Sequence, residues 1–267
     1  MPGYHHVEHV MGMAISIDVH DEVTGAPGLD SVVTWLHHVD RTFSTYRDDS
    51  TISRLGRGEI DVRDVTDEAR DVLLRCEDLR RVTAGAFDAF VVPAPNGTML
   101  DPSGYVKGWA IERAALLLES CGLRHFAINA GGDVALRGKP IPDPTWQVGI
   151  RDPGDPSRVC AVLPLNGPCG IATSGSYERG AHIIDPRTGG PTADVASVTV
   201  VGPDLGVADA YATAVFVMGV GGLAWLALRP GYDGLVISHD GQLHASPRFR
   251  AHLGRVTSPR LQASEHG

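Results

Sequence analysis

Two oxygen-bearing side chains, Asp209 and Thr213, stand four residues apart in a segment (207–218) that is rich in alanine and valine and almost free of charge. An α-helix places positions i and i+4 on one face, and a buried carboxylate there needs a partner. Carboxylate and hydroxyl oxygens suit Mg²⁺, which also shares the phosphate oxygens of substrates. The alternative is that Asp209 is an acidic residue near a helix N-terminus, favoured by the helix dipole.

A second candidate is the segment 100–112, LDPSGYVKGWAIE. A turn at 101–104 leads into a helix whose first turns carry Lys107, one of two lysines in the chain. The free N–H groups at a helix start, together with a lysine, can bind an anion. On the local pattern alone, a helix cap with a solvent-facing lysine is the simpler interpretation.

Two further segments combine glycine with polar residues. In 128–138, INAGGDVALRG, the paired glycines favour a plain hairpin over close approach to a ligand. The segment 173–189, TSGSYERGAHIIDPRTG, gathers hydroxyls, an aspartate and His182 in a loop. His182 could be a general base near neutral pH; a surface loop in which it bonds only its neighbours is an equally good interpretation.

The elements that would position these residues follow from the hydrophobic periodicity. We expect helices at 29–43, 67–84, 105–121, 207–218 and 223–229, and strands at 11–19, 126–129, 133–136, 145–151, 159–165, 195–201 and 235–238. Helices and strands do not alternate regularly, which predicts a mixed α+β fold with largely antiparallel sheets and packed helices. We expect one domain over 1–267, which could comprise two intertwined subdomains, with a frayed polar tail at 257–267.

Composition limits the partners. The net charge is −9 and no long basic run is present, which argues against a nucleic-acid-binding surface. No apolar stretch approaches the roughly 18 residues of a membrane span. The N-terminal residues carry neither a signal-peptide pattern nor a lipobox cysteine, so we expect a cytoplasmic protein.

Taken together and in order, these segments resemble the ApbE family of flavin transferases from about residue 11 to residue 219. The segments that carry the resemblance are MGMAISIDV, FSTYRDDSTISRL, GAFDAFVVP, LDPSGYVKGWAIE, INAGGDVALRG, TSGSYERGAHIIDPRTG and SVTVVGPDLGVADAYATAVFVMG. The resemblance implies a Mg²⁺-dependent enzyme that moves the FMN part of FAD onto a Thr or Ser hydroxyl of an acceptor flavoprotein. AMP would be the leaving group.

The resemblance also assigns roles by position. Asp209, Thr213 and the carbonyl oxygen of Gly104 correspond to the metal ligands, and Asp209 and His182 are the expected catalytic residues. His182 matches the histidine expected to help deprotonate the acceptor hydroxyl. The positions that correspond to FAD contacts are Met11, Tyr46, Ala86, Phe87, Asp88, Asp101, Lys107 and, through its main chain, Ile183.

Some features depart from the family pattern. The span 93–101 lacks a WGF-like segment, and the motif often written SGDY reads SGSY at 174–177. Two alternatives therefore stay open beside the transferase. One is an FAD pyrophosphatase that yields FMN and AMP, and the other is a non-enzymatic FAD-binding protein.

Overall fold

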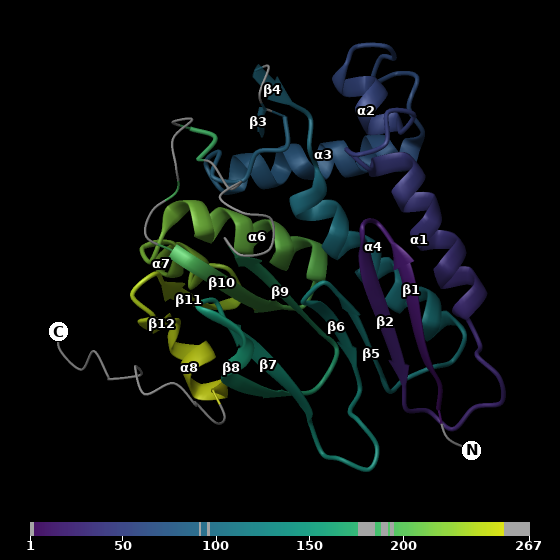
Figure 1. Cartoon of the computed structure of the whole chain (residues 1–267), viewed down its shortest axis with the longest axis vertical. Coiled ribbons are helices and arrows are strands. Elements are labelled where there is room, and N and C mark those ends of the chain that lie inside the picture. The colour runs from purple at the N-terminus through teal and green to yellow at the C-terminus, as the bar shows by residue number, and fades with distance from the viewer. Residues whose placement is uncertain are drawn as a thin grey trace.

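A single antiparallel sheet of eight strands organises the chain (Figure 1). The computed structural model describes residues 3–90, 92–94, 97–175, 185–187, 192 and 195–253. The strands of the sheet, in spatial order, are β1 (His5–Val10), β2 (Met13–Val19), β5 (Phe126–Ala130), β6 (Asp133–Arg137), β9 (Cys169–Gly175), β10 (Val195–Gly202), β11 (Asp233–Ser238) and β12 (Leu243–Ala245). Two separate hairpins pair β3 (Val92–Ala94) with β4 (Gly97–Met99) and β7 (Trp146–Asp152) with β8 (Asp155–Leu165).

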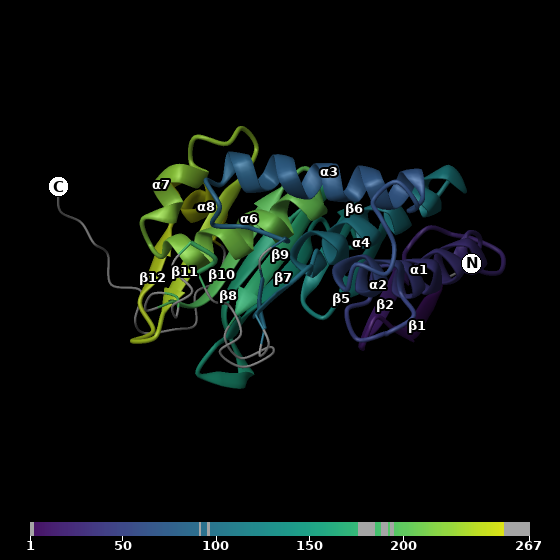
Figure 2. The same ribbon diagram turned by 90° about the horizontal axis from the view of Figure 1, so that it is seen from above.

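Helices cover one face of this sheet. Three of them, α6 (Leu205–Met218), α4 (Ser103–Ser120) and α1 (Leu29–Phe43), lie in a row from the β10 side to the β1 side (Figures 1 and 2). The other helices are α2 (Thr51–Gly56), α3 (Asp67–Val82), α7 (Gly222–Leu226) and α8 (Pro247–His252). The expected mixed α+β fold with antiparallel sheets is confirmed.

The two faces of the sheet bury different residues because side chains alternate along each strand. On β2, Ile15 and Ile17 enter the main core beneath the helices, whereas Ser16 and Asp18 face the other way. A second, smaller core lies between the sheet and the β7–β8 hairpin. It contains Val134, Leu136, Trp146, Ile150, Cys160, Ala161, Leu163, Leu165, Ile171, Leu235, Ile237 and Phe249.

Most expected elements are present, with shifted ends. The helix expected at 29–43 has those bounds, whereas the strand expected from residue 11 begins at Met13. Met11 and Gly12 instead form the β1–β2 turn with φ angles of 57° and 73°, as a two-residue type I′ turn requires. The tail at 257–267 lies outside the described residues. Within the described ranges, no helix is long and apolar enough to cross a membrane.

The four cysteines are free thiols in different environments, which leads to a prediction. Burial raises the pKa of the Cys76 thiol to about 12 and that of Cys160 to about 11, whereas Cys121 is exposed. Since the thiolate is the reactive form, iodoacetamide near neutral pH should modify Cys121 at least about 10-fold faster than Cys76. Peptide mapping at successive times measures this, with the guanidinium-unfolded chain as control. Equal rates in the folded chain would contradict the burial of Cys76.

Candidate functional site

Helices α4 and α6 cross so closely that only glycine fits at the crossing. A Cβ on Gly108 would lie 2.5 Å from the carbonyl oxygen of Leu205, and one on Gly206 would lie 2.9 Å from the ring of Tyr105. This contact brings the next turn of α6 against α4, where the Gly108 N–H donates a 3.1 Å hydrogen bond to Oδ2 of Asp209. The crossing therefore fixes a carboxylate that is only 2% exposed.

The helix-start interpretation of Asp209 is wrong. Helix α6 begins two residues before the expected segment, and Asp204 caps it by accepting a 2.8 Å hydrogen bond from the Val207 N–H. Asp209 lies in the second turn, on the buried side of the helix. Its carboxylate points at another helix rather than at the N–H groups of its own first turn.

Thr213 lies one turn further along α6 and faces the start of α4. A Cβ on Gly104 would lie 3.2 Å from Oγ1 of Thr213 and 3.4 Å from the ring of Phe87. The Thr213 hydroxyl is also 3.4 Å from the hydroxyl of Ser174 on β9. The structure therefore brings Asp209, Thr213 and Gly104 to one place, at the first turns of α4.

Lys107 is not the solvent-facing lysine that the local pattern favoured. Its Nζ lies 2.9 Å from Oδ2 of Asp133, with side-chain exposures of 16% and 0%. The other oxygen of Asp133 accepts a 3.0 Å hydrogen bond from the Thr173 N–H. The segment 128–138 does form a hairpin, but its aspartate belongs to the site. The sequence interpretation did not include Asp133, although an acidic residue directly after the paired glycines was a visible signal.

Three of the expected FAD contacts line one shallow pocket. It is formed by the β1–β2 turn, the end of α1 with the residues that follow it, and the first turns of α4. Its lining residues are Met11, Met13, Val39, Asp40, Phe43, Ser44, Thr45, Tyr46, Ser103, Val106 and Lys107. Of these, Tyr46 is 81% exposed, so its ring is accessible to a ligand.

The segment 86–88 and Asp101 surround the start of α4 from another side. Ala86 and Phe87 are buried. Oδ1 of Asp88 accepts a hydrogen bond from the Phe90 N–H at 2.8 Å. The Asp101 side chain accepts a 2.9 Å hydrogen bond from the Ser103 N–H, and the Asp101 N–H donates a 2.8 Å hydrogen bond to the Ala89 carbonyl. The bond between Asp101 and Ala89 ties the end of this segment to the start of α4.

His182 and Ile183 lie outside the described residues. The described residues that follow in that loop are 185–187, and Asp185 and Arg187 form an ion pair at 2.8 Å. Hydrogen bonds from the Arg187 guanidinium hold the pKa of Asp185 below its usual range. A Cβ on Gly85 would lie 3.6 Å from Cγ of Arg187, which places this end of the loop beside the segment 86–88.

The chemistry of the donor set suits a hard cation. It combines one carboxylate (Asp209), one hydroxyl (Thr213) and one main-chain carbonyl (Gly104). Lys107 lies about one turn after Gly104 on α4. The described part of the chain holds no cluster of three or more His, Cys, Asp or Glu side chains arranged for a metal. A set with a single carboxylate fits Mg²⁺ that completes its shell with water and phosphate oxygens.

Comparison with known proteins decides the family. The sequence profile of the ApbE family matches residues 11–96 and 93–236. The chain belongs to the ApbE family. A protein named FAD:protein FMN transferase from Rhodobacter capsulatus is 32% identical over 235 residues, which are 84% of this chain and 41% of that protein. One of the same name from Treponema pallidum is 34% identical over 203 residues, or 67% and 56% of the two chains.

Solved ApbE structures support the fold. The flavin transferase ApbE from Vibrio cholerae superposes with a TM-score of 0.79 at 26% identity, over 94% of this chain and 99% of that one. An ApbE protein from Thermotoga maritima gives a TM-score of 0.81 at 22% identity. The chain spans about half the length of the curated ApbE-family relatives that it matches first.

Proposed function

We propose that this ApbE-family chain transfers the FMN part of FAD to a Thr or Ser hydroxyl of an acceptor flavoprotein and releases AMP. The observation that carries the proposal is the convergence of Asp209, Thr213 and Gly104 at the start of α4, beside the Lys107–Asp133 ion pair. The names of the matched relatives point to the same activity. Because the site draws on segments from Met11 to Thr213, we propose that the whole chain acts as one domain.

A magnesium ion would be held by the Asp209 carboxylate, the Thr213 hydroxyl and the Gly104 carbonyl. Bound there, it would neutralise charge on the pyrophosphate of FAD. In an α-helix the Gly108 N–H pairs with the Gly104 carbonyl. Here the same N–H donates to Asp209, and that bond competes with the helical pairing. Sharing of this N–H would leave the Gly104 oxygen more available to a cation.

The remaining contacts would bind FAD. Lys107 and the positive end of the α4 dipole suit the pyrophosphate. Met11 and Tyr46 line the pocket next to Lys107, where a thioether and an aromatic ring suit a flat ring system. The other proposed FAD contacts are Ala86, Phe87, Asp88, Asp101 and the main chain of Ile183.

In the proposed step, the acceptor hydroxyl oxygen attacks the phosphorus of the FMN phosphate. The bond from this phosphorus to the bridging oxygen breaks, and AMP leaves with that oxygen. His182 would take the proton of the hydroxyl. The site's contribution is mainly to position the phosphates and to stabilise their charge.

Asp133 should act on FAD binding through Lys107. Asp133→Asn keeps an oxygen for the Thr173 N–H but removes the ion pair that positions Lys107. The KM for FAD should therefore rise about 10-fold. In the double variant Asp133→Asn/Lys107→Met, the loss should be no greater than in Lys107→Met alone. Steady-state kinetics at varied FAD measures both effects. Losses that multiply would show that Asp133 acts independently of Lys107.

The proposed function is tested by incubating the chain with FAD, Mg²⁺ and flavoproteins from the same organism. Intact-mass spectrometry should find an FMN-sized adduct on one acceptor, with AMP released in equal amount. AMP with free FMN only, even with acceptors present, would favour the pyrophosphatase alternative. Tight retention of FAD without Mg²⁺-dependent release of AMP would favour the binding protein.

A further inference from the structure

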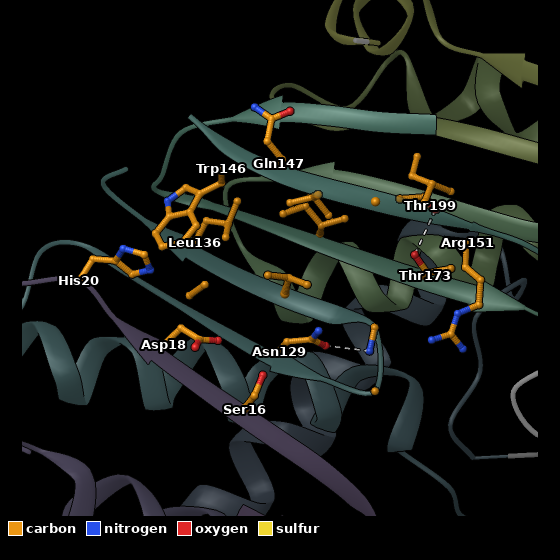
Figure 3. A pocket seen from close by; sticks show the side chains of 18 residues that line it. Ser16, Asp18, His20, Asn129, Leu136, Trp146, Gln147, Arg151, Thr173 and Thr199 are labelled. Carbon is orange, nitrogen blue, oxygen red and sulfur yellow. Dashed lines mark hydrogen bonds between the residues drawn. The ribbon is translucent and has the colours of Figure 1, made fainter. Parts of the chain in front are cut away.

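A groove of about 400 Å³ lies on the face of the sheet opposite the helices (Figure 3). The sheet forms its floor and β7 forms one wall. The polar side chains that line it come from four strands of the sheet, from β7 and from the residue after β2: Ser16, Asp18, His20, Asn129, Gln147, Arg151, Thr173 and Thr199. Its volume falls in the range of ligand sites, yet none of the FAD contacts proposed above lines it.

The wall of this groove is the edge of a strand. All six residues from Trp146 to Arg151 line it, and no residue of β8 does. Since β7 pairs only with β8 among the described strands, its other edge faces the groove. A strand edge with open N–H and C=O groups can pair with another extended chain.

The register of the β7–β8 hairpin predicts which main-chain N–H and C=O groups of β7 are not bonded to β8. Gln147 lies opposite Pro164, which has no N–H to donate. Hydrogen-bonded and non-hydrogen-bonded pairs alternate along an antiparallel ladder. We therefore expect the main-chain groups of Gln147 and Gly149 to point away from β8 and into the groove. A strand added there would span roughly 20 Å over six residues.

One end of the groove adjoins the proposed active site. His20 and Trp146, whose ring centroids are 5.0 Å apart, mark the far end, and Arg151 lies at the opposite end near Thr173 (Figure 3). The Thr173 N–H donates to Asp133, the partner of Lys107. The next residue, Ser174, contacts Thr213 on the other face of the sheet. A chain that leaves the groove past Arg151 therefore reaches the end of β9, and the site lies beside this end on the other face of the sheet.

The charges of the groove differ between its ends. Asp18, toward the His20 end, is paired with His5 at 2.6 Å. Arg151, at the site end, is exposed and has no ion pair within the described ranges. An occupant with a carboxylate side chain close to Arg151 would complement this charge.

We propose that the groove binds the acceptor polypeptide as an extended strand along β7, with a carboxylate side chain at Arg151, and so delivers its hydroxyl to the active site. This inference rests on the proposed function and names the surface that selects its protein substrate. Main-chain pairing with β7 would provide affinity, and Arg151 would provide specificity.

The test uses a library of peptides of about twelve residues with one fixed threonine and the other positions drawn from Ala, Ser, Val, Asp and Lys. The wild-type chain, Arg151→Glu and Arg158→Glu are each incubated with the library, FAD and Mg²⁺. FMN-modified peptides are then sequenced by mass spectrometry. Arg158 is the matched control, because it is an exposed arginine on β8 that does not line the groove.

With the wild-type chain, modified peptides should be enriched at least about three-fold in Asp at one fixed spacing from the threonine. Arg151→Glu should change that preference to Lys, and Arg158→Glu should leave it unaltered. The affinity for FAD without peptide should be equal in all three chains.

Three results would overturn the proposal. Modified peptides with the same preference in Arg151→Glu would exclude the groove while leaving the transferase intact. No modified peptide with any chain, together with no FMN adduct on any flavoprotein from the same organism, would reject the proposed function itself. An altered oligomeric state of Arg151→Glu by light scattering, with an unchanged preference, would show that a second copy of the chain occupies the groove.

Discussion

Asp209→Asn should lower the rate of FMN transfer by at least about 100-fold while the chain stays folded. The amide oxygen of asparagine can still accept the hydrogen bond from the Gly108 N–H, so the α4–α6 contact is kept. What is lost is the negative charge that attracts a magnesium ion to a site with only one carboxylate. Transfer rates across a magnesium titration, together with the melting temperature, measure the two effects separately.

Asp204→Asn is the matched control for this experiment. It makes the same chemical change on the same helix, at the N-cap, where asparagine caps as well as aspartate. Its transfer rate and melting temperature should stay close to those of the wild-type chain. A full transfer rate for Asp209→Asn would contradict the metal role, and an equal loss in both variants would indicate a general effect of charge.

Gly108→Ala should have the largest effect on stability. The added methyl group would lie 2.5 Å from the Leu205 carbonyl oxygen, which is main chain and cannot turn aside. Overpacking of this kind costs roughly 1–3 kcal/mol, more than the roughly 1 kcal/mol by which alanine favours a helix over glycine. The helices must move apart, which also moves Asp209 away from Gly104. We expect a lower free energy of unfolding and at least about a 10-fold slower transfer.

Urea unfolding and the transfer assay check this prediction. Gly56→Ala is the control, since a Cβ at Gly56, the last residue of α2, would meet only Leu100, with its Cβ at 3.4 Å and its main-chain nitrogen at 3.9 Å, which are ordinary contacts. Wild-type stability and activity in Gly108→Ala would mean that the two helices do not depend on glycine at their crossing.

Elements with strong periodicity could be predicted from the sequence, and weak ones could not. The amphipathic helix α1 has the expected bounds, because its apolar stripe is regular. The periodicity did not predict β1 as a separate strand, since His5 and His9 occupy its exposed face and it has little apolar alternation. Helix α2 buries only Ile52, and β9 is rich in small residues, so neither gives a clear periodic signal.

The residues of the candidate site also differ in how far the sequence could predict them. The spacing of Asp209 and Thr213 predicted a shared helical face, and the structure confirms that face, with Asp209 buried and Thr213 half-buried. The place of Lys107 could not be derived locally, because its partner Asp133 comes from a hairpin across the sheet. The nearness of Gly104 to Thr213 depends on the crossing of α4 and α6, a tertiary contact that no local pattern encodes.

Strand β9 serves both faces of the sheet with consecutive residues, Thr173 toward the groove and Ser174 toward Thr213. Because side chains alternate strictly along a strand, inserting or deleting one residue between Cys169 and Thr173 would exchange these two hydroxyls. The faces on which these two hydroxyls lie therefore depend on the number of residues in β9. Variant libraries aimed at altering the acceptor should diversify Thr173 by substitution and keep the length of β9 fixed.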